Sequence, residues 1–503
     1  MRRQARGILL AGLALGTACT VGPDYQRPQV KLTDTFRDQV KPADARSFAD
    51  LPWWDVFDDE AMKELIVEAL QNNYDLRIAV ARVEQARAQA GIARAQAYPA
   101  VGLGMGAGYG RGTFIPGTTN PPIGTGQVPQ RGAQFNIEAG FSWELDLWGK
   151  FRRGTEAAVA QFLASEDGRR AVLISLIADV ASAYIVLRQL DAQLEISQRT
   201  VKNYEKTLEL YTARLEGGTG SRLEVATGQA QVNDAQATAY DLQRQINDQE
   251  NLICLLLGRP PSPIPRGRTL AAFTIPPEIP AGLPATLLER RPDVHQAEEL
   301  LIAANAKIGV AKANFFPTIS LTGVMGLASP DLTKLFTGPS FLWNVSGTAS
   351  WLAPILQGAQ LNSQYEGAWA SWQEFLANYE KSVITALREV ASSLNDTAQL
   401  KPVLEQRESQ VKSLTDAVNL ALDRYEGGVS SYLEVTTNQN SLFPAELNLA
   451  AVRAQRYLAL ISLYRALGGG WQVPKEASAA AAAPAPAAPP ADAVASQPAP
   501  APK

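Results

Sequence analysis

The chain has very few of the residues that build metal sites, disulfides and most catalytic centres. Its 503 residues include one histidine, His295, and two cysteines, Cys19 and Cys254. This excludes a disulfide framework and leaves almost no basis for a His/Cys metal site. No nucleophile, base and acid stand at a recognisable spacing, so we expect no enzyme activity and no cofactor. The net charge of −4 argues against nucleic acid as a partner.

Long hydrophobic runs are also scarce, apart from one at the N-terminus. Three arginines precede the apolar residues 8–15, and small residues then lead to Cys19. This order predicts a secretory signal over residues 1–18. Cys19 stands where a bacterial lipoprotein signal carries its lipid-modified cysteine, so we expect lipidation there. Such signals usually have Leu at the third residue before the cysteine, where this chain has Gly16, and ordinary cleavage after Ala18 is the alternative.

No later segment is convincing as a transmembrane helix. The best candidate, residues 171–187, is shorter than the roughly 20 apolar residues that a span requires, and it contains Asp179. An exported protein without such helices can still cross a membrane as a closed β-barrel. Cys254 lies in the apolar run 252–257 and is expected to be a buried thiol.

Residues 135–147 alternate strictly between two kinds of side chain. One set is apolar and runs from Phe135 to Leu147, and the other includes Glu138, Glu144 and Asp146. A period of two predicts a strand, and roughly ten residues of a tilted strand cross a bilayer. We therefore expect the three carboxylates to face a water-filled lumen, either favouring cations or merely solvated. A half-buried strand of a soluble sandwich is the alternative.

The chain is a tandem duplication. Residues 214–229 and 424–439 are identical at ten of sixteen positions, at an offset of 210. Each copy predicts a helix, two strands and a long helical hairpin, in that order. The expected first helices are 76–97 and 294–315. The expected strands are 101–109, 135–147, 319–327 and 341–352, with Gly/Pro/Thr-rich loops at 110–132 and 328–340.

The segments after the strands predict very long helices. Apolar residues spaced three and four apart run through 187–215 and recur in 411–425, which is typical of a coiled-coil seam. A helix over 151–216 would extend roughly 100 Å at 1.5 Å per residue. Pro402 is expected to break the matching helix of the second copy, and Pro444 to kink the last one.

Paired glycines predict the tips of the hairpins. The pairs are Gly217–Gly218 and Gly427–Gly428, and glycine tolerates the left-handed conformation at a helix end. Ser221 with Glu224, and Ser431 with Glu434, have the spacing of a capping box. We expect a division into a signal peptide (1–18), an N-terminal lipid-anchored extended segment (19–55), two repeats (56–265 and 266–474) and a disordered Ala/Pro tail (475–503).

Four strands cannot close a barrel within one chain. Open strand edges are not tolerated in hydrocarbon, and closure requires about eight strands or more. The barrel must therefore be shared among chains. Two chains would give a narrow bore and three would give twelve strands, a choice that geometry alone supports weakly.

Several motifs resemble one known family. They are Cys19 followed by VGPDYQRP (21–28), the Trp53–Trp54 segment, RRPDV (290–294) leading into AANAKIGVAKANFFP (303–317), the tip repeats, and ALGGGW (466–471). Together they span residues 19 to about 474. The chain resembles the outer-membrane factors of tripartite efflux systems, the TolC/OprM type, within the nodulation-type lipoprotein branch.

The resemblance implies an α+β membrane protein with four β-strands and long coiled-coil helices per protomer. Three protomers would form a 12-stranded β-barrel on a periplasmic α-helical barrel. It also implies a passive outer-membrane exit duct for small molecules or drugs, connected with antibiotic resistance. The implied partners are a periplasmic adaptor (membrane-fusion) protein, an inner-membrane pump of the resistance-nodulation-division type and outer-membrane lipid.

The family motif also implies site residues. The periplasmic gate would include Leu433, Thr437 and Asn440, of which the last two replace an Asp and an Arg in OprM-like members. Asp423, Arg424 and Tyr425 are further candidates, and Leu433 is alternatively a plain seam residue. The adaptor would dock at the glycine-containing tips, 214–224 and 424–434. The exit duct of a protein-secretion system and a structural lipoprotein without a pore are the alternative functions.

Overall fold

The computed structural model describes residues 20–30, 59–111, 131–273, 290–351 and 355–469. The signal peptide, Cys19, most of the first inter-strand loop and the Ala/Pro tail therefore lie outside the described residues. The chain divides into two compact units, each built from both repeats. The first contains residues 1–31, 79–169 and 292–385, and the second contains residues 32–78, 170–291 and 386–503.

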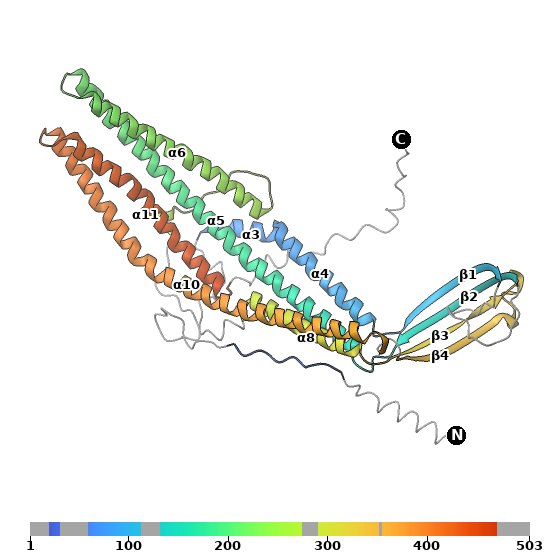
Figure 1. Ribbon diagram of the computed structural model, residues 1–503. Coiled ribbons are helices and arrows are strands. Elements are labelled where there is room, and N and C mark those ends of the chain that lie inside the picture. Colours follow the sequence, from blue (N-terminus) through green and yellow to red (C-terminus); the bar gives the residue numbers. More distant parts are fainter. Residues whose placement is uncertain (1–19, 31–58, 112–130, 274–289, 352–354, 470–503) are drawn as a thin grey trace. The chain divides into compact units, whose positions relative to one another are not determined.

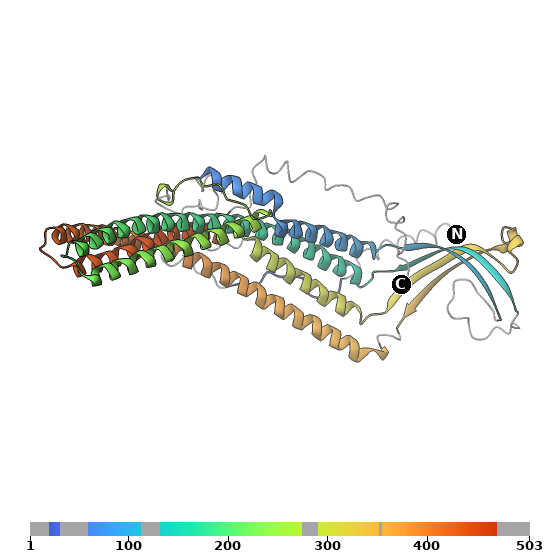
Figure 2. The same cartoon turned by 90° about the horizontal axis from the view of Figure 1, so that it is seen from above.

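The first unit contains one antiparallel sheet. Its strands pair in the order β1-β2-β3-β4, and Figure 2 shows that they curl along their length. Their bounds are β1 Ala100–Arg111, β2 Arg131–Glu144, β3 Thr318–Ser329 and β4 Phe341–Ser350. The register places Glu138 opposite Gly104 on one side and Gly326 on the other. The strand prediction is therefore confirmed, and so is its two-sided alternation.

The outward face of this sheet is apolar and exposed. On β1, Leu103 is 86% exposed and Met105 83%, and on β4 Trp343 is 71% exposed. The opposite face of β1 carries glycine at every second position, from Gly102 to Gly110. Side chains so exposed are suited to hydrocarbon rather than water.

Helices α4 (Tyr74–Ala95) and α8 (Pro292–Ala313) precede the strands of the two repeats, as predicted. Helix α5 (Lys150–Glu216) and helix α10 (Gly358–Glu426) follow them, with 67 and 69 residues. The first parts of α5 and α10 belong to the first unit and their remainders to the second. At 1.5 Å per residue, each helix is about 100 Å long.

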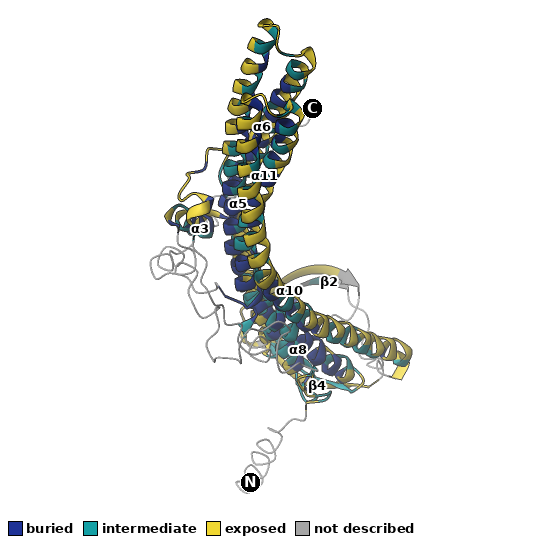
Figure 3. Ribbon diagram, turned by 90° about the vertical axis from the view of Figure 1, so that its left-hand side faces the viewer, coloured by how far each residue is buried: buried dark blue, intermediate teal, exposed yellow. Residues whose placement is uncertain are grey.

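The second unit is a pair of helical hairpins, which Figure 1 shows as α5 with α6 and α10 with α11. Helix α6 covers Arg222–Leu257 and α11 covers Tyr432–Ala466. A shorter helix, α3 (Glu60–Asn72), begins this unit. Figure 3 shows buried residues along the facing sides of these helices and exposed residues on their outer sides. That distribution confirms the expected coiled-coil seam. Cys254 is buried, as expected.

One stretch of α5 passes a length-and-composition test for a membrane span. In that stretch 61% of the residues are buried inside the protein. A mostly buried apolar helix is also what a core helix looks like, so this is weak evidence for a helical span.

Both prolines that were expected to disturb a helix lie inside continuous helices. Pro402 was expected to break its helix, but it lies inside α10, which runs unbroken to Glu426. Proline removes one backbone hydrogen bond, and a helix of 69 residues keeps its remaining bonds on both sides. Pro444 lies inside α11, which continues to Ala466, so it does not end that helix, and the kink expected there stays a prediction.

Gly326 gives a test of the sheet. A Cβ added at Gly326 would lie 2.3 Å from the Ile137 carbonyl oxygen, whereas one at Gly102 would meet nothing within 4 Å. We expect Gly326→Ala to destabilise the sheet by about 1–3 kcal/mol, as overpacking does, and Gly102→Ala to have little effect. Thermal unfolding of the purified protein, followed by circular dichroism, measures this. Equal behaviour of the two variants would contradict the register.

Candidate functional site at the hairpin tips

Both hairpin tips turn at the second glycine of a pair. Gly218 and Gly428 have φ of 75° and 72°, the left-handed region in which glycine is favoured. At the first tip the Ser221 side chain and the Glu224 carboxylate form the expected capping box. The four glycines at which the adaptor is predicted to dock thus lie at the ends of α5 and α10.

The second tip is built differently. Ser431 precedes α11 but its side chain makes no capping hydrogen bond. The Glu434 carboxylate instead lies 3.3 Å from the guanidinium of Arg424. The predicted second capping box is therefore wrong, because an ion pair across the tip takes the carboxylate that the cap requires.

A cluster of tyrosines fills the space between the two hairpins. The described core here consists of Tyr211, Ala421, Tyr425 and Val435, with Tyr432 packed against it. The rings of Tyr211 and Tyr432 meet edge to face, with centroids 4.4 Å apart. The Arg214 guanidinium lies over the Tyr425 ring, 4.6 Å from its centroid, an attractive arrangement for a cation and an aromatic face.

Uncharged hydrogen bonds join the hairpins just behind this cluster. The Gln231 side-chain amide donates to the Asn440 Oδ1 at 2.8 Å. The Tyr432 hydroxyl donates to the Gln231 Oε1 at 3.3 Å. The Tyr204 hydroxyl donates to the carbonyl of Gln439, the residue before Asn440, at 3.2 Å. Near the tip, residues of the first repeat thus hold α11 through uncharged groups, and an ion pair between Arg199 and Glu446 at 2.7 Å follows further along α11.

The predicted gate residues divide into two groups. Leu433 is 71% exposed, and Thr437 and Asp423 are exposed as well. Tyr425, by contrast, is only 5% exposed. The structure corrects the placement of Tyr425, because a ring buried between hairpins cannot line an opening.

Gln231, Tyr211 and Tyr432 were not among the predicted site residues. Gln231 lies 209 residues from its partner Asn440, one residue short of the repeat offset. The two are therefore not equivalent positions of the repeats, and comparing the repeats does not point to their contact. The only sequence signal was the spacing of seven between Tyr204 and Tyr211, which indicates a seam and not a polar link.

The three predicted lumen carboxylates also have different surroundings. Glu138 lies on β2 between the glycines of its two neighbouring strands. Glu144 ends the strand and lies 3.4 Å from the Lys150 ammonium. Asp146 follows the strand, and its carboxylate accepts the backbone N–H groups of Phe151 and Arg152. The strand was predicted to reach Leu147, so Asp146 is corrected to a residue that caps α5.

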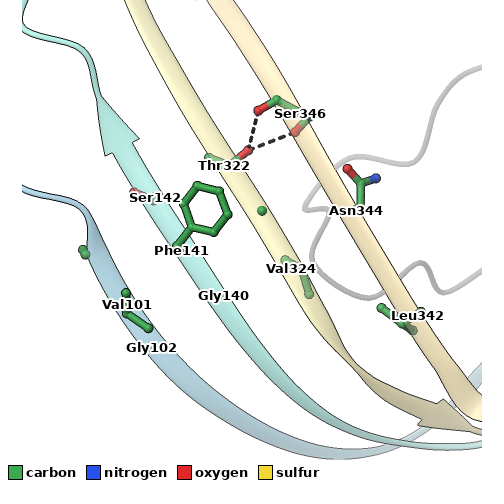
Figure 4. Close-up of a pocket in the computed structure, with 12 residues that line it drawn as sticks. Val101, Gly102, Gly140, Phe141, Ser142, Thr322, Val324, Leu342, Asn344 and Ser346 are labelled. Atoms are coloured by element: carbon green, nitrogen blue, oxygen red, sulfur yellow. Dashed lines mark hydrogen bonds between the residues drawn. The ribbon is translucent and has the colours of Figure 1, made fainter. Parts of the chain in front are cut away.

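A shallow hollow of about 400 Å³ lies on the sheet. Figure 4 shows Thr322 next to Ser346, and their hydroxyl groups are 2.9 Å apart. The Phe141 ring lies against Gly323, where an added Cβ would be 2.2 Å from it. Gly102, Gly140 and Asn344 contribute to the lining of the hollow. Among the described residues no group of three His, Cys, Asp or Glu side chains is placed to hold a metal ion.

The family follows from sequence and fold together. A family model for outer membrane efflux proteins matches residues 65–259 and 283–469. The chain belongs to this family. The solvent efflux pump outer membrane protein SrpC of Pseudomonas putida is 36% identical over 471 residues, which are 92% of this chain and 98% of that protein. The cation efflux system protein CusC of Escherichia coli is 33% identical, over 91% and 96%.

Solved structures agree with this assignment. The open state of the MtrE outer membrane channel of Neisseria gonorrhoeae matches with a TM-score of 0.79 and 31% identity, over 90% of this chain and 99% of that one. The structural neighbours are trimeric channels. The predicted fold is therefore confirmed, and the protein is an outer-membrane exit duct of an efflux system. These matches support neither the protein-secretion alternative nor the structural lipoprotein without a pore.

The buried tyrosines predict how the hairpins respond to alkali. Burial raises the pKa of Tyr204 to about 12, and burial next to Tyr432 raises that of Tyr211. Below pH 10 these phenols are protonated in both folded and unfolded chains. Between pH 10 and 12 only the unfolded chain loses the Tyr204 proton, so hairpin stability should fall in that window. Helical circular dichroism against pH tests this.

Tyr204→Phe supplies the comparison for this titration. The variant should lose part of the fall in stability between pH 10 and 12, because one ionising group is gone. The exposed Tyr240 is the matched control, and Tyr240→Phe should leave the profile as it is. A Tyr204→Phe profile identical to that of the unmodified protein would contradict the assignment.

Proposed function

We propose that this efflux protein is a passive duct for small molecules, closed at its hairpin tips by an uncharged constriction. It docks through those tips to a periplasmic adaptor and receives substrate from an inner-membrane pump of the resistance-nodulation-division type. Lipid attached to Cys19 anchors it, and the helices extend into the periplasm. No enzymatic step is part of this function, since the fold supplies a conduit and the pump supplies energy.

The proposal of an uncharged constriction rests on the exposed residues of α11 next to the tip. Leu433 and Thr437 are exposed on α11, one turn apart, beside a tip whose contacts between hairpins are aromatic and amide groups. The Thr437 hydroxyl donates to the Leu433 carbonyl, so its donor is used within the helix. In a threefold assembly, each of these side chains would be repeated around the axis. An apolar ring of leucines then restricts the passage of ions by excluding water.

Asn440 has a second role in this proposal. Its side chain accepts a hydrogen bond from Gln231, so it holds α11 against the first hairpin. Opening the tip would separate these partners and expose two amides, which water can satisfy. A neutral hydrogen bond of this kind contributes about 0.5–1.5 kcal/mol. The closed state is thus favoured modestly, and docking of an adaptor is sufficient to overcome it.

The strands supply the exit path. Glu138 faces the side of the sheet that carries glycine on β1, so the path beside it is wide. Repeated in three protomers, Glu138 would form an acidic ring that attracts cations and repels anions. Glu144 contributes less, because Lys150 neutralises it at 3.4 Å. Substrates of solvent or cationic character, like those named for SrpC and CusC, suit such a path.

Substrate class is tested in cells that lack their own outer-membrane ducts. The gene is expressed with candidate adaptor and pump pairs, and resistance to organic solvents, to cationic antibiotics and to metal salts is compared. We expect gains for at least one solvent or antibiotic. A gain confined to metal salts would assign the chain to cation efflux, and no gain with any co-purifying pump would contradict the proposal.

The leucine ring has a matched control in the first repeat. Leu223 occupies the equivalent position at the 210-residue offset and is 73% exposed, against 71% for Leu433. We expect Leu433→Ala to raise single-channel conductance several-fold and to admit vancomycin, because the apolar ring is removed. Leu223→Ala should do neither. Unchanged conductance in Leu433→Ala would rule out the constriction.

A neutral constriction should also be insensitive to salt. Raising ionic strength from 0.1 to 1 M shortens the screening length from about 10 to about 3 Å, which weakens charged contacts. The resting conductance, normalised to bulk conductivity, should therefore stay constant. The variant Thr437→Asp with Asn440→Arg, which introduces charges there, should lose that constancy. Salt-dependent opening of the unmodified channel would contradict the proposal.

A further inference from the structure

Residues 20–27 belong to the first unit and contact both repeats. We call this segment the strap. Thr20 packs on Gly149, where a Cβ would come within 2.8 Å of its methyl group. The Val21 N–H donates to the Trp148 carbonyl at 3.1 Å. The start of the strap is therefore fixed at the turn between β2 and α5 of the first repeat.

The middle of the strap contacts the second repeat at backbone distance. Gly22 has φ of 112°, and a Cβ there would lie 2.5 Å from the Gly309 Cα. The buried Asn305 side chain donates to the Pro23 carbonyl at 2.9 Å. Both contacts are on α8. Two glycines, one of them in a conformation that side chains rarely adopt, permit this close approach.

Charged and phenolic groups continue the strap's contacts. The Arg153 guanidinium, whose side chain is only 6% exposed, donates to the Asp24 carboxylate at 2.5 Å and to that of Glu156 at 2.9 Å. The Tyr25 hydroxyl donates to Glu298 at 3.1 Å, and Arg27 donates to its other oxygen at 2.8 Å. Arg153 belongs to α5 and Glu298 to α8, so the strap again joins the two repeats.

The same place holds a direct contact between the repeats. The Trp148 indole N–H donates to the Pro317 carbonyl at 2.8 Å, and its ring stacks on Phe316 at 4.7 Å. Trp148 lies between β2 and α5, and Pro317 lies between α8 and β3. The strap thus reinforces the point at which helices of both repeats pass into strands.

We propose that the strap is an intramolecular clamp that fastens the two repeats where β2 passes into α5 and α8 passes into β3. Its contacts reach Trp148, Gly149 and Arg153 of the first repeat and Asn305, Gly309 and Glu298 of the second. The clamp does not depend on the lipid attachment proposed at Cys19, and the experiments below separate the two.

The test measures hydrogen exchange on the full, oligomeric channel purified from outer membranes in detergent. In the unmodified protein the Val21 amide and segments 145–153 and 305–317 should be protected. Asp24→Ala combined with Asn305→Ala removes two clamp contacts, and we expect exchange to accelerate about tenfold in all three places, as the loss of roughly 1.4 kcal/mol implies. Gln26→Ala, at an exposed strap position, is the control and should change nothing.

Two further variants separate the clamp from lipid attachment and from misfolding. A form secreted with an ordinary cleavable signal and carrying Cys19→Ser has no acyl group, and it should keep the same protection. If protection there is lost, the lipid and not the strap holds the repeats together, and the clamp is wrong. Asp24→Ala alone changes one largely exposed carboxylate and should show a smaller acceleration. In the double variant, exchange of the Val21 amide could accelerate while segments 145–153 and 305–317 stay protected. That result would show that the strap does not hold the two repeats together, and it would contradict the proposal.

Discussion

Strands β1 and β4 each form an edge of the four-stranded sheet, and each leaves a row of backbone N–H and C=O groups unpaired within the chain. Water satisfies such groups on a soluble protein, but hydrocarbon does not. The exposed apolar side chains on these strands place the edges in hydrocarbon. One protomer is therefore incomplete in the membrane, and three protomers joined from β1 to β4 close a ring of twelve strands. The trimer, the lumen and the repeated tip residues all depend on this closure.

The two repeats are joined at two places, and the contacts at these places differ in chemistry. At the foot of the sheet, the repeats are held by a buried arginine, an indole and the N-terminal strap. Near the tips they are held by tyrosines and amides, and the exposed ion pair between Arg424 and Glu434 lies within the second repeat. Exposed ion pairs contribute little, about 0–1 kcal/mol. This difference is consistent with the proposal that the duct opens at its hairpin tips.

Much of this architecture was predictable from local patterns. Alternation identified the strands, the three-and-four spacing identified the helices, and Gly218 and Gly428 identified the tips, because each pattern reflects a constraint within a few residues. The failures involve partners on a different helix or strand. Glu434 pairs with Arg424 and not with its cap, and Asp146 binds the N-terminus of α5 once the strand has ended at Glu144. Tyr425 looked like a gate residue until its ring was placed against Tyr211.

Site residues were harder to predict for the same reason. Gln231 meets Asn440 from a position that the repeat does not pair with it, and the strap crosses about 280 residues of sequence to reach Asn305. Neither contact has a signal in local composition. Contacts of this kind arise only when two copies of one unit pack asymmetrically, so that equivalent residues acquire different neighbours.

The most direct test of closure is disulfide crosslinking between β1 and β4 of neighbouring protomers. Cys254→Ser removes the buried thiol, and one cysteine at Met105 is combined in turn with one at Trp343, Val345 or Gly347, all on described strands. Closure by three protomers predicts that at least one pair gives linked dimers and trimers, and nothing larger, on non-reducing gels of membranes. Failure of every pair to link protomers, or a ladder that continues beyond three, would contradict it.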